Sequence, residues 1–158
     1  RLIKDRTMLQ IPLFGNLIKQ NILSKFGKTF GILISAGVSV MDSMELLIKV
    51  VDNRVYELAL IEAKKDIENG ISISQSLRDT NVFPPIFIQL LSTGEETGEI
   101  DTLALKASEF YAKQVAAIVD RLTSLIEPML IIIVGGVVGV VIIVTYLPIF
   151  NFGAALAQ

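Results

Sequence analysis

Residues 129–147 read MLIIIVGGVVGVVIIVTYL, and this stretch decides how the chain folds. No Asp, Glu, Lys or Arg occurs from Pro128 to Gln158. As a helix these residues would rise about 28 Å, close to the roughly 30 Å of the hydrocarbon core of a bilayer. The stretch is therefore predicted to be a transmembrane helix, and the alternative is a central helix of a large all-α core.

The composition favours a membrane protein and argues against most familiar enzyme classes. Of 158 residues, 52% are hydrophobic, and the mean hydropathy is +0.62, above the usual range of soluble domains. The chain has no Cys and no His, which excludes thiol chemistry, structural zinc and Ser-His-Asp triads. A formal net charge of -2 provides no basic field for nucleic acid. We expect no cofactor, no metal and no direct nucleic-acid partner.

One short stretch partly matches a nucleotide-binding motif. Gly27-Lys28-Thr29 matches the end of a phosphate-binding loop, but Ile22 stands where the pattern requires Gly. A preceding strand, which the pattern also needs, is not predicted. Lys28 is therefore interpreted as a solvated helix residue.

Basic residues set the predicted orientation of the span. Lys113 and Arg121 lie on its N-terminal side, and no basic residue follows it. Because segments rich in Lys and Arg stay in the cytoplasm, the bulk of the chain is expected to be cytoplasmic and the C-terminus outside. The first thirty residues hold six basic residues and one acid, Asp5, which is typical of a juxtamembrane segment. The chain begins with Arg1 and not with Met, so we expect a fragment that lacks an upstream membrane helix.

Helix start and stop signals predict an all-α fold, since no period-two pattern is long enough for a strand. The expected architecture is a six-helix cytoplasmic bundle whose last helix continues into the transmembrane helix, with a bend at Pro128. The expected helices run, in chain order, from about Asn16 to Ala36-Gly37, from behind Ser39 with Val51 among the residues it buries, from the cap Asn53 to Asn69-Gly70, from near Ser74 to Thr80, from Pro84-Pro85 to Thr93-Gly94, and from after Gly98 into the span. The expected segments are a juxtamembrane stretch (1–13), a cytoplasmic domain (14–127), the membrane helix (128–148) and a short tail (149–158).

The acidic segment, Gly94 to Asp101, reads GEETGEID and places four carboxylates within seven positions. This spacing does not fit a calcium-binding loop. One interpretation is structural: Gly94 ends a helix, Gly98 makes the turn, and Glu99 and Asp101 face the positive N-terminus of the next helix. The other interpretation is that the segment is a contact surface for a partner protein.

Two further features mark the predicted membrane helix. Glu127 directly precedes Pro128; it either marks the end of polar solvent or accepts a hydrogen bond from a neighbouring helix. Gly135, Gly136 and Gly139 place small residues at a four-residue step. This step allows two membrane helices to pack closely, and the alternative is that Gly is merely tolerated in lipid.

Five motifs occur in a fixed order along most of the chain. They are Ser35-Ala36-Gly37-Val38, Glu68-Asn69-Gly70-Ile71-Ser72-Ile73-Ser74, Val82-Phe83-Pro84, Gly94-Glu95-Glu96-Thr97-Gly98-Glu99-Ile100, and Glu127-Pro128 before an apolar span closed by Pro148. In this order, from about Ile11 to Pro148, the chain resembles the type II secretion system protein F family. These are inner-membrane platform proteins of type II secretion and type IV pilus assembly. The resemblance implies two copies of a six-helix cytoplasmic domain interleaved with three membrane helices, of which this chain is the second copy with the last helix.

The resemblance also implies a function and a set of partners. A platform protein of this kind is not an enzyme; it binds a cytoplasmic hexameric assembly ATPase and transmits its motion, so that pilin or pseudopilin subunits leave the bilayer. Other inner-membrane assembly proteins, membrane lipid and further copies of the chain are the remaining expected partners, in the bacterial inner membrane. A membrane-anchored helical scaffold of another envelope complex is the alternative. The candidate motif and contact residues are Gly37, Gly70, Phe83, Pro84, Gly94, Glu95, Glu96, Gly98, Glu127 and Pro128, with Gly135, Gly136 and Gly139 for packing in the membrane.

Overall fold

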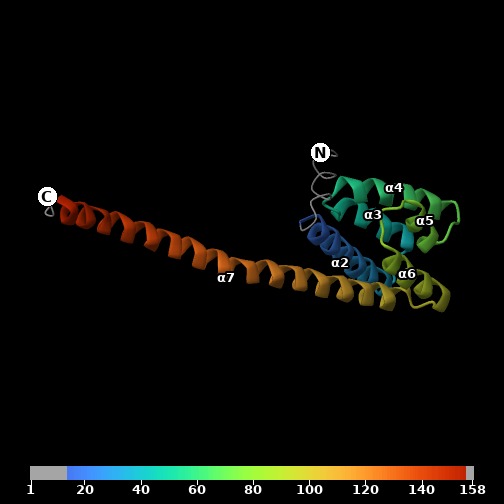
Figure 1. The fold of residues 1–158 in the computed structure, drawn as a ribbon. Coiled ribbons are helices and arrows are strands. Elements are labelled where there is room, and N and C mark those ends of the chain that lie inside the picture. The colour runs from blue at the N-terminus through green and yellow to red at the C-terminus, as the bar shows by residue number, and fades with distance from the viewer. Residues whose placement is uncertain (1–13, 156–158) are drawn as a thin grey trace. The chain divides into compact units, whose positions relative to one another are not determined.

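The computed structural model describes residues 14–155 and is entirely helical apart from turns over that range (Figure 1). It contains six helices, α2 to α7, among the described residues. The chain divides into two units between Ala116 and Ala117. The first unit holds α2 to α6 and the start of α7, and the second unit holds the rest of α7. The predicted all-α fold class is confirmed.

The first described helix, α2, spans Phe14–Ser35 and ends in a turn that glycine makes possible. Gly37 has a φ of 80°, a left-handed conformation that costs glycine little. The N–H of Val38 donates to the carbonyl of Leu33 at 3.0 Å, so this turn satisfies a carbonyl that the helix end would leave free. The end of the helix at Ser35 agrees with the predicted end within one residue.

Helices α3 (Val40–Val50) and α4 (Arg54–Glu68) begin at the predicted side-chain caps. The hydroxyl of Ser39 accepts from the N–H of Asp42 at 3.1 Å. The amide oxygen of Asn53 accepts from the N–H of Val55 at 3.0 Å. Each cap satisfies a backbone donor that has no partner within its helix.

Helices α5 (Ile73–Asp79) and α6 (Pro85–Thr97) follow in the same unit. Pro84 is the cap of α6 and Pro85 occupies its first turn, where the missing N–H of proline costs nothing. The predicted end of this helix at Thr93-Gly94 is wrong, because α6 continues to Thr97 and ends at Gly98, which has a φ of 74°. The left-handed residue that stops the helix is therefore the second glycine of the acidic segment.

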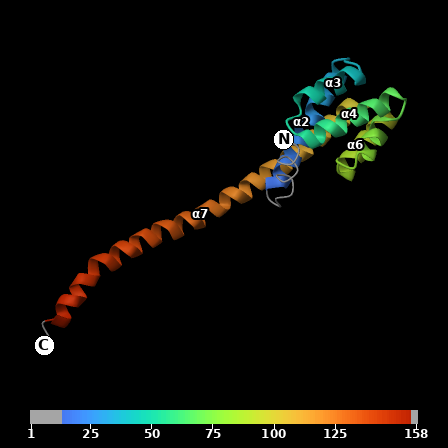
Figure 2. The ribbon, with the colours of Figure 1, turned by 90° about the horizontal axis from the view of Figure 1, so that it is seen from above.

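The last helix, α7, spans Ile100–Ala155 without interruption. It passes through Pro128 as one helix, and the bend expected there stays a prediction. Residues 100–146 of α7 include a stretch long and apolar enough to cross a bilayer, with none of its most apolar window buried within the protein. Figure 2 follows α7 from its start in the first unit to its C-terminal end.

The core of the first unit is built around aromatic side chains from four different parts of the chain. The ring of Phe26 lies 5.6 Å from that of Phe83 and 5.4 Å from that of Phe87, measured between centroids. Tyr56 packs edge-on against Phe83 at 5.4 Å, and Tyr111 of α7 lies 5.8 Å from Phe87. Edge-to-face pairs at these distances add to the burial of apolar area. The cluster joins α2, α4, α6 and the start of α7.

Candidate functional site

The acidic segment lies where α6 ends and α7 begins. The N–H of Glu99 donates to the carbonyl of Gly94 at 2.9 Å across the turn at Gly98. The backbone carbonyl of Glu99 accepts the first hydrogen bond of α7, from the N–H of Leu103 at 3.0 Å. Asp101 lies in the first turn of α7, where a negative charge is favourable. The structural interpretation is therefore confirmed for Gly98 and Asp101.

Gly94 has a different role from the predicted one. It lies inside α6 and is buried, and a Cβ atom there would lie 2.7 Å from the Cα of Ile100. A separation below 3.0 Å forces one of the two backbones to shift. Gly94 is therefore needed for the close approach of α6 and α7, and not as the end of a helix.

Glu95 holds the N-terminus of α5, although the two elements are far apart in sequence. One carboxylate oxygen accepts from the N–H of Ile73 at 2.5 Å and the other accepts from the N–H of Ser74 at 2.8 Å. The hydroxyl of Ser72 accepts from the N–H of Gln75 at 3.3 Å. The first donors of α5, which have no partner within the helix, are thus satisfied by Glu95 and Ser72 together. Glu95 is committed to the fold of the first unit.

Glu96 and Glu99 are the exposed carboxylates of the acidic segment. Glu96 accepts a side-chain hydrogen bond from Ser92 at 3.2 Å, on the surface of α6. Neither carboxylate reaches a basic side chain in the ion pairs found among the described residues. Contact with a partner therefore stays a prediction for this segment, and Glu96 and Glu99 are the side chains available for it.

Acid–base or metal chemistry finds no support in the described part of the chain. No group of three or more His, Cys, Asp or Glu side chains lies together there as a metal site would require. The carboxylate whose pKa is lowered is Glu45, and the cause is its hydrogen bond and charge interaction with Lys49. This pair is exposed on α3 and is an ordinary ion pair within one helix.

The remaining motif residues of the first unit are turn or core residues. Gly70 has a φ of 87° and ends α4, as Gly37 ends α2. Phe83 is 7% exposed and lies in the aromatic cluster, and Pro84 is the cap of α6. These positions explain why such residues are needed for folding, and a contact with a partner at any of them stays a prediction.

A close contact between α2 and α7 was missed in the sequence. We call it the glycine seam; it consists of Gly27 and Gly31 on α2 and of Ala104, Leu105 and Ser108 on α7. A Cβ atom at Gly27 would lie 2.7 Å from the carbonyl oxygen of Ala104. The signal for it is the four-residue step between the two glycines, which Gly27 and Gly31 share with Gly135 and Gly139 of the apolar stretch.

In the second unit, the predicted membrane residues lie along the exposed surface of α7. Glu127 and Met129 are exposed on either side of Pro128. Gly135 and Gly139 have no atom within 4 Å of a Cβ placed on them. Close packing of these glycines against another helix, and a hydrogen bond to Glu127, stay predictions.

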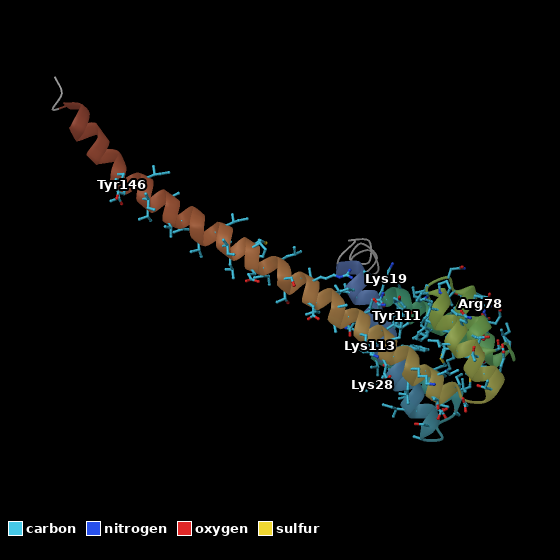
Figure 3. All side chains as sticks on the ribbon, turned by 60° about the horizontal axis from the view of Figure 1, so that its bottom comes forward. Lys19, Lys28, Arg78, Tyr111, Lys113 and Tyr146 are labelled. Atoms are coloured by element: carbon cyan, nitrogen blue, oxygen red, sulfur yellow. The ribbon has the colours of Figure 1, made fainter. Side chains whose placement is uncertain are left out.

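Figure 3 shows how the labelled side chains of the first unit lie. Tyr111 lies toward the bundle, in keeping with its exposure of 3%. Lys19, Lys28 and Lys113 are exposed. Lys28 is therefore a solvated helix residue, as predicted.

Comparison with known proteins identifies the family of the chain. The family described as "Type II secretion system (T2SS), protein F" matches residues 26–148. The chain is 38% identical to the type IV pilus assembly protein PilC of Myxococcus xanthus over 96% of its own length and 36% of that relative. It is 35% identical to PilC of Pseudomonas aeruginosa, over 94% of the chain and 40% of the relative.

A secretion protein is also among the similar proteins. The type II secretion system protein F of Pseudomonas aeruginosa is 28% identical over 91% of the chain and 36% of that relative. The chain thus spans well under half the length of each of these relatives. With the all-α first unit and an apolar last helix, the match over residues 26–148 shows that the chain belongs to the type II secretion system protein F family.

Proposed function

We propose that the chain is part of an inner-membrane platform that couples a cytoplasmic assembly ATPase to the insertion of pilin or pseudopilin subunits. The proposal depends mainly on one observation about α7. This single helix begins among the core residues of the first unit and also contains the apolar stretch. Similarity to pilus assembly and secretion proteins supports the same role. The platform is not an enzyme and needs no cofactor.

The proposed topology follows from charge and length. Residues 14–127 form the cytoplasmic domain, residues 128–148 cross the membrane, and residues 149–158 are outside. Lys113 and Arg121 precede the span, and basic residues beside a span favour the cytoplasmic side. Residues 1–13 are the juxtamembrane stretch and lie outside the described residues.

The ATPase contact is placed on the exposed carboxylates Glu96 and Glu99, because Glu95 is committed to α5. Exposed acids at the end of a rigid helix attract a basic surface and speed its association. Pilin or pseudopilin, other inner-membrane proteins and further copies of the platform are proposed to contact the membrane segment, through Glu127 and the step of Gly135, Gly136 and Gly139.

The experiment that tests this proposal is crosslinking and pulldown of the full-length protein with the assembly ATPase encoded near its gene. The variant Glu96→Lys/Glu99→Lys is expected to lose ATPase binding without loss of helix content. The matched control is Glu62→Lys, an exposed acid on α4, which is expected to bind as the wild type does. If the wild-type protein binds no assembly ATPase, the alternative of a helical scaffold in another envelope complex is favoured.

A second experiment tests the coupling role of α7. A helix-breaking insertion between Lys113 and Leu122 is expected to abolish filament assembly or secretion and to leave ATPase binding intact. Assembly at wild-type levels with such an insertion would contradict coupling through this helix.

A further inference from the structure

The backbones of α2 and α7 touch along the glycine seam. At Gly27 a Cβ atom would lie 2.7 Å from the carbonyl oxygen of Ala104 and 3.0 Å from the N of Ser108. At Gly31 it would lie 2.7 Å from the Cγ of Leu105 and 2.8 Å from the carbonyl oxygen of Asp101. Most of these neighbours are backbone atoms, which cannot turn aside as a side chain can. The seam therefore has no room for a single added carbon without a shift of one helix.

A hydrogen bond crosses the seam and fixes its position along the helices. The hydroxyl of Ser24 donates to the carbonyl oxygen of Ser108 at 3.1 Å, over a sequence separation of 84 residues. Ala104 and Ala107 are fully buried, and Ser108 is 6% exposed. The α7 side of the seam thus consists of small residues closed off from solvent, together with Leu105, which is half-buried against Gly31.

Only the first turns of α7 pack against the other helices of the first unit. Gly94 contacts the backbone of Ile100, the seam follows, and Tyr111 packs on Phe87 at 5.8 Å. From Ala112 to Ala116 the side chains are exposed except for Val115, which is half-buried. The seam therefore lies in the middle of the part of α7 that packs against the bundle, and the same helix contains the apolar span.

We infer that the glycine seam is a fixed joint: it keeps α7 in one rotation and register against α2 while force passes from the bundle to the membrane helix. This inference rests on the proposed function. Leu103 and Leu105 flank the small residues of α7, since neighbours along a helix are about 100° apart. Leu105 already packs against Gly31, and a rotation of α7 that turned Leu103 toward α2 would bring a second leucine to backbone that has no room for a Cβ.

The test uses the full-length protein in its host membrane, with Gly27→Val and Gly31→Val as the seam variants. The control is Ala116→Val, which adds two methyl groups at an exposed position of the same helix. Because the proposed contact residues Glu96 and Glu99 are exposed and lie outside the seam, ATPase pulldown should stay within about twofold of wild type in all three variants. Filament number or secretion should fall by roughly tenfold or more in the seam variants alone, through loss of register between packed helices.

A second variant keeps the inference testable if the seam variants are degraded. Residues 1–158 contain no Cys, and Ser24→Cys/Ser108→Cys introduces two thiols at the seam; gel mobility before and after reduction shows the fraction in which a disulfide locks α2 to α7, and the filament comparison is made on that fraction. A fixed joint tolerates this lock, and filament number under oxidising conditions should equal that after reduction. Loss of filaments on oxidation, restored by reductant, would overturn the inference.

Two further results also count against the fixed joint. Normal filament number in both seam variants would show that the register of α7 does not matter. Loss of ATPase binding in the seam variants would show that the seam shapes the ATPase surface and does not transmit force. ATPase binding by the wild-type protein is measured in parallel, and that result alone tests the proposed function.

Discussion

The carboxylate of Glu95 accepts the backbone N–H of Ser74 at 2.8 Å and ties α6 to the first turn of α5, 21 residues earlier in the chain. Its other oxygen takes the N–H of Ile73. With only seven residues, α5 is too short to be stable by itself. Its position in the bundle therefore depends on this pair of charge-assisted hydrogen bonds.

Removing this carboxylate is expected to destabilise the first unit. Glu95→Ala should lower the free energy of unfolding by about 2 kcal/mol, since two backbone donors lose a charged acceptor. Glu95→Gln keeps one oxygen and should cost about half of that. Urea unfolding followed by circular dichroism measures the difference, and Glu96→Ala is the control, with an expected change of no more than about 0.5 kcal/mol. Equal stability of Glu95→Ala and Glu96→Ala would contradict the role of Glu95 as a cap.

The two glycines of the acidic segment should respond differently to substitution. Gly98→Ala places a Cβ in a left-handed turn with a φ of 74° and should cost about 1 kcal/mol. Gly98→Asn should cost less, because Asn adopts this conformation more readily.

Gly94→Ala should cost more than Gly98→Ala, about 2 kcal/mol, because its methyl group would collide with the backbone of Ile100. Gly94→Asn should be worse still, because the added volume has no space. The midpoints of thermal unfolding of the four variants measure this order, with Gly98→Asn expected to be the most stable and Gly94→Asn the least. A gain in stability on Gly94→Ala would mean that α6 and α7 separate at no cost.

Features set by neighbouring residues could be predicted from the sequence. Ser39 and Asn53 were identified as caps because the N–H groups they bind are two or three residues away. The roles of Gly94 and Glu95 depend on contacts that appear only after folding. A glycine gives the same signal whether it supplies a positive φ or a close approach, which is why Gly94 was wrongly expected to end α6.

The glycine seam illustrates the same limit over a greater distance. The hydroxyl of Ser24 and the carbonyl of Ser108 are 84 residues apart, and no local pattern pairs them. A four-residue step such as that from Gly27 to Gly31 is typical of a close helix contact but does not specify the partner helix, and this contact was not predicted. The acidic segment could be identified from the sequence as a candidate contact surface. Only the structure shows that Glu95 is hydrogen-bonded to the backbone of α5, whereas Glu96 is exposed.

A charge in the apolar stretch should prevent membrane insertion of α7. Val138 lies near the middle of residues 129–147 and is 51% exposed on the isolated helix. Val138→Asp should raise the cost of insertion by about 3 kcal/mol and reduce the fraction that resists alkaline extraction. The controls are Val138→Leu and Ala117→Asp, both of which should insert as the wild type does. Full insertion of Val138→Asp would place the membrane boundary elsewhere on α7.

Two buried tyrosines should make the first unit sensitive to alkali. Burial raises the pKa of Tyr56 well above its usual value, and burial also raises the pKa of Tyr111. Below about pH 10 both phenols are protonated in the folded and the unfolded chain, so their contribution to stability is complete. Above that pH the unfolded chain releases the proton of Tyr56 more readily than the folded chain does, so stability falls by up to about 1.4 kcal/mol per pH unit for this tyrosine. The pKa of Tyr111 is raised as well, so its ionisation acts in the same direction.

Tyr56→Phe removes one of these two groups and tests the origin of the effect. Its urea midpoint should fall less steeply than that of the wild type between pH 10 and pH 11, because one fewer proton is released on unfolding. Tyr111→Phe should also flatten the profile. At pH 8, where no phenol ionises, neither substitution has a titration effect, and this pH supplies the reference midpoint for each variant. A wild-type slope in Tyr56→Phe would mean that the phenol of Tyr56 ionises as readily in the folded core as in the unfolded chain, which its exposure of 2% argues against.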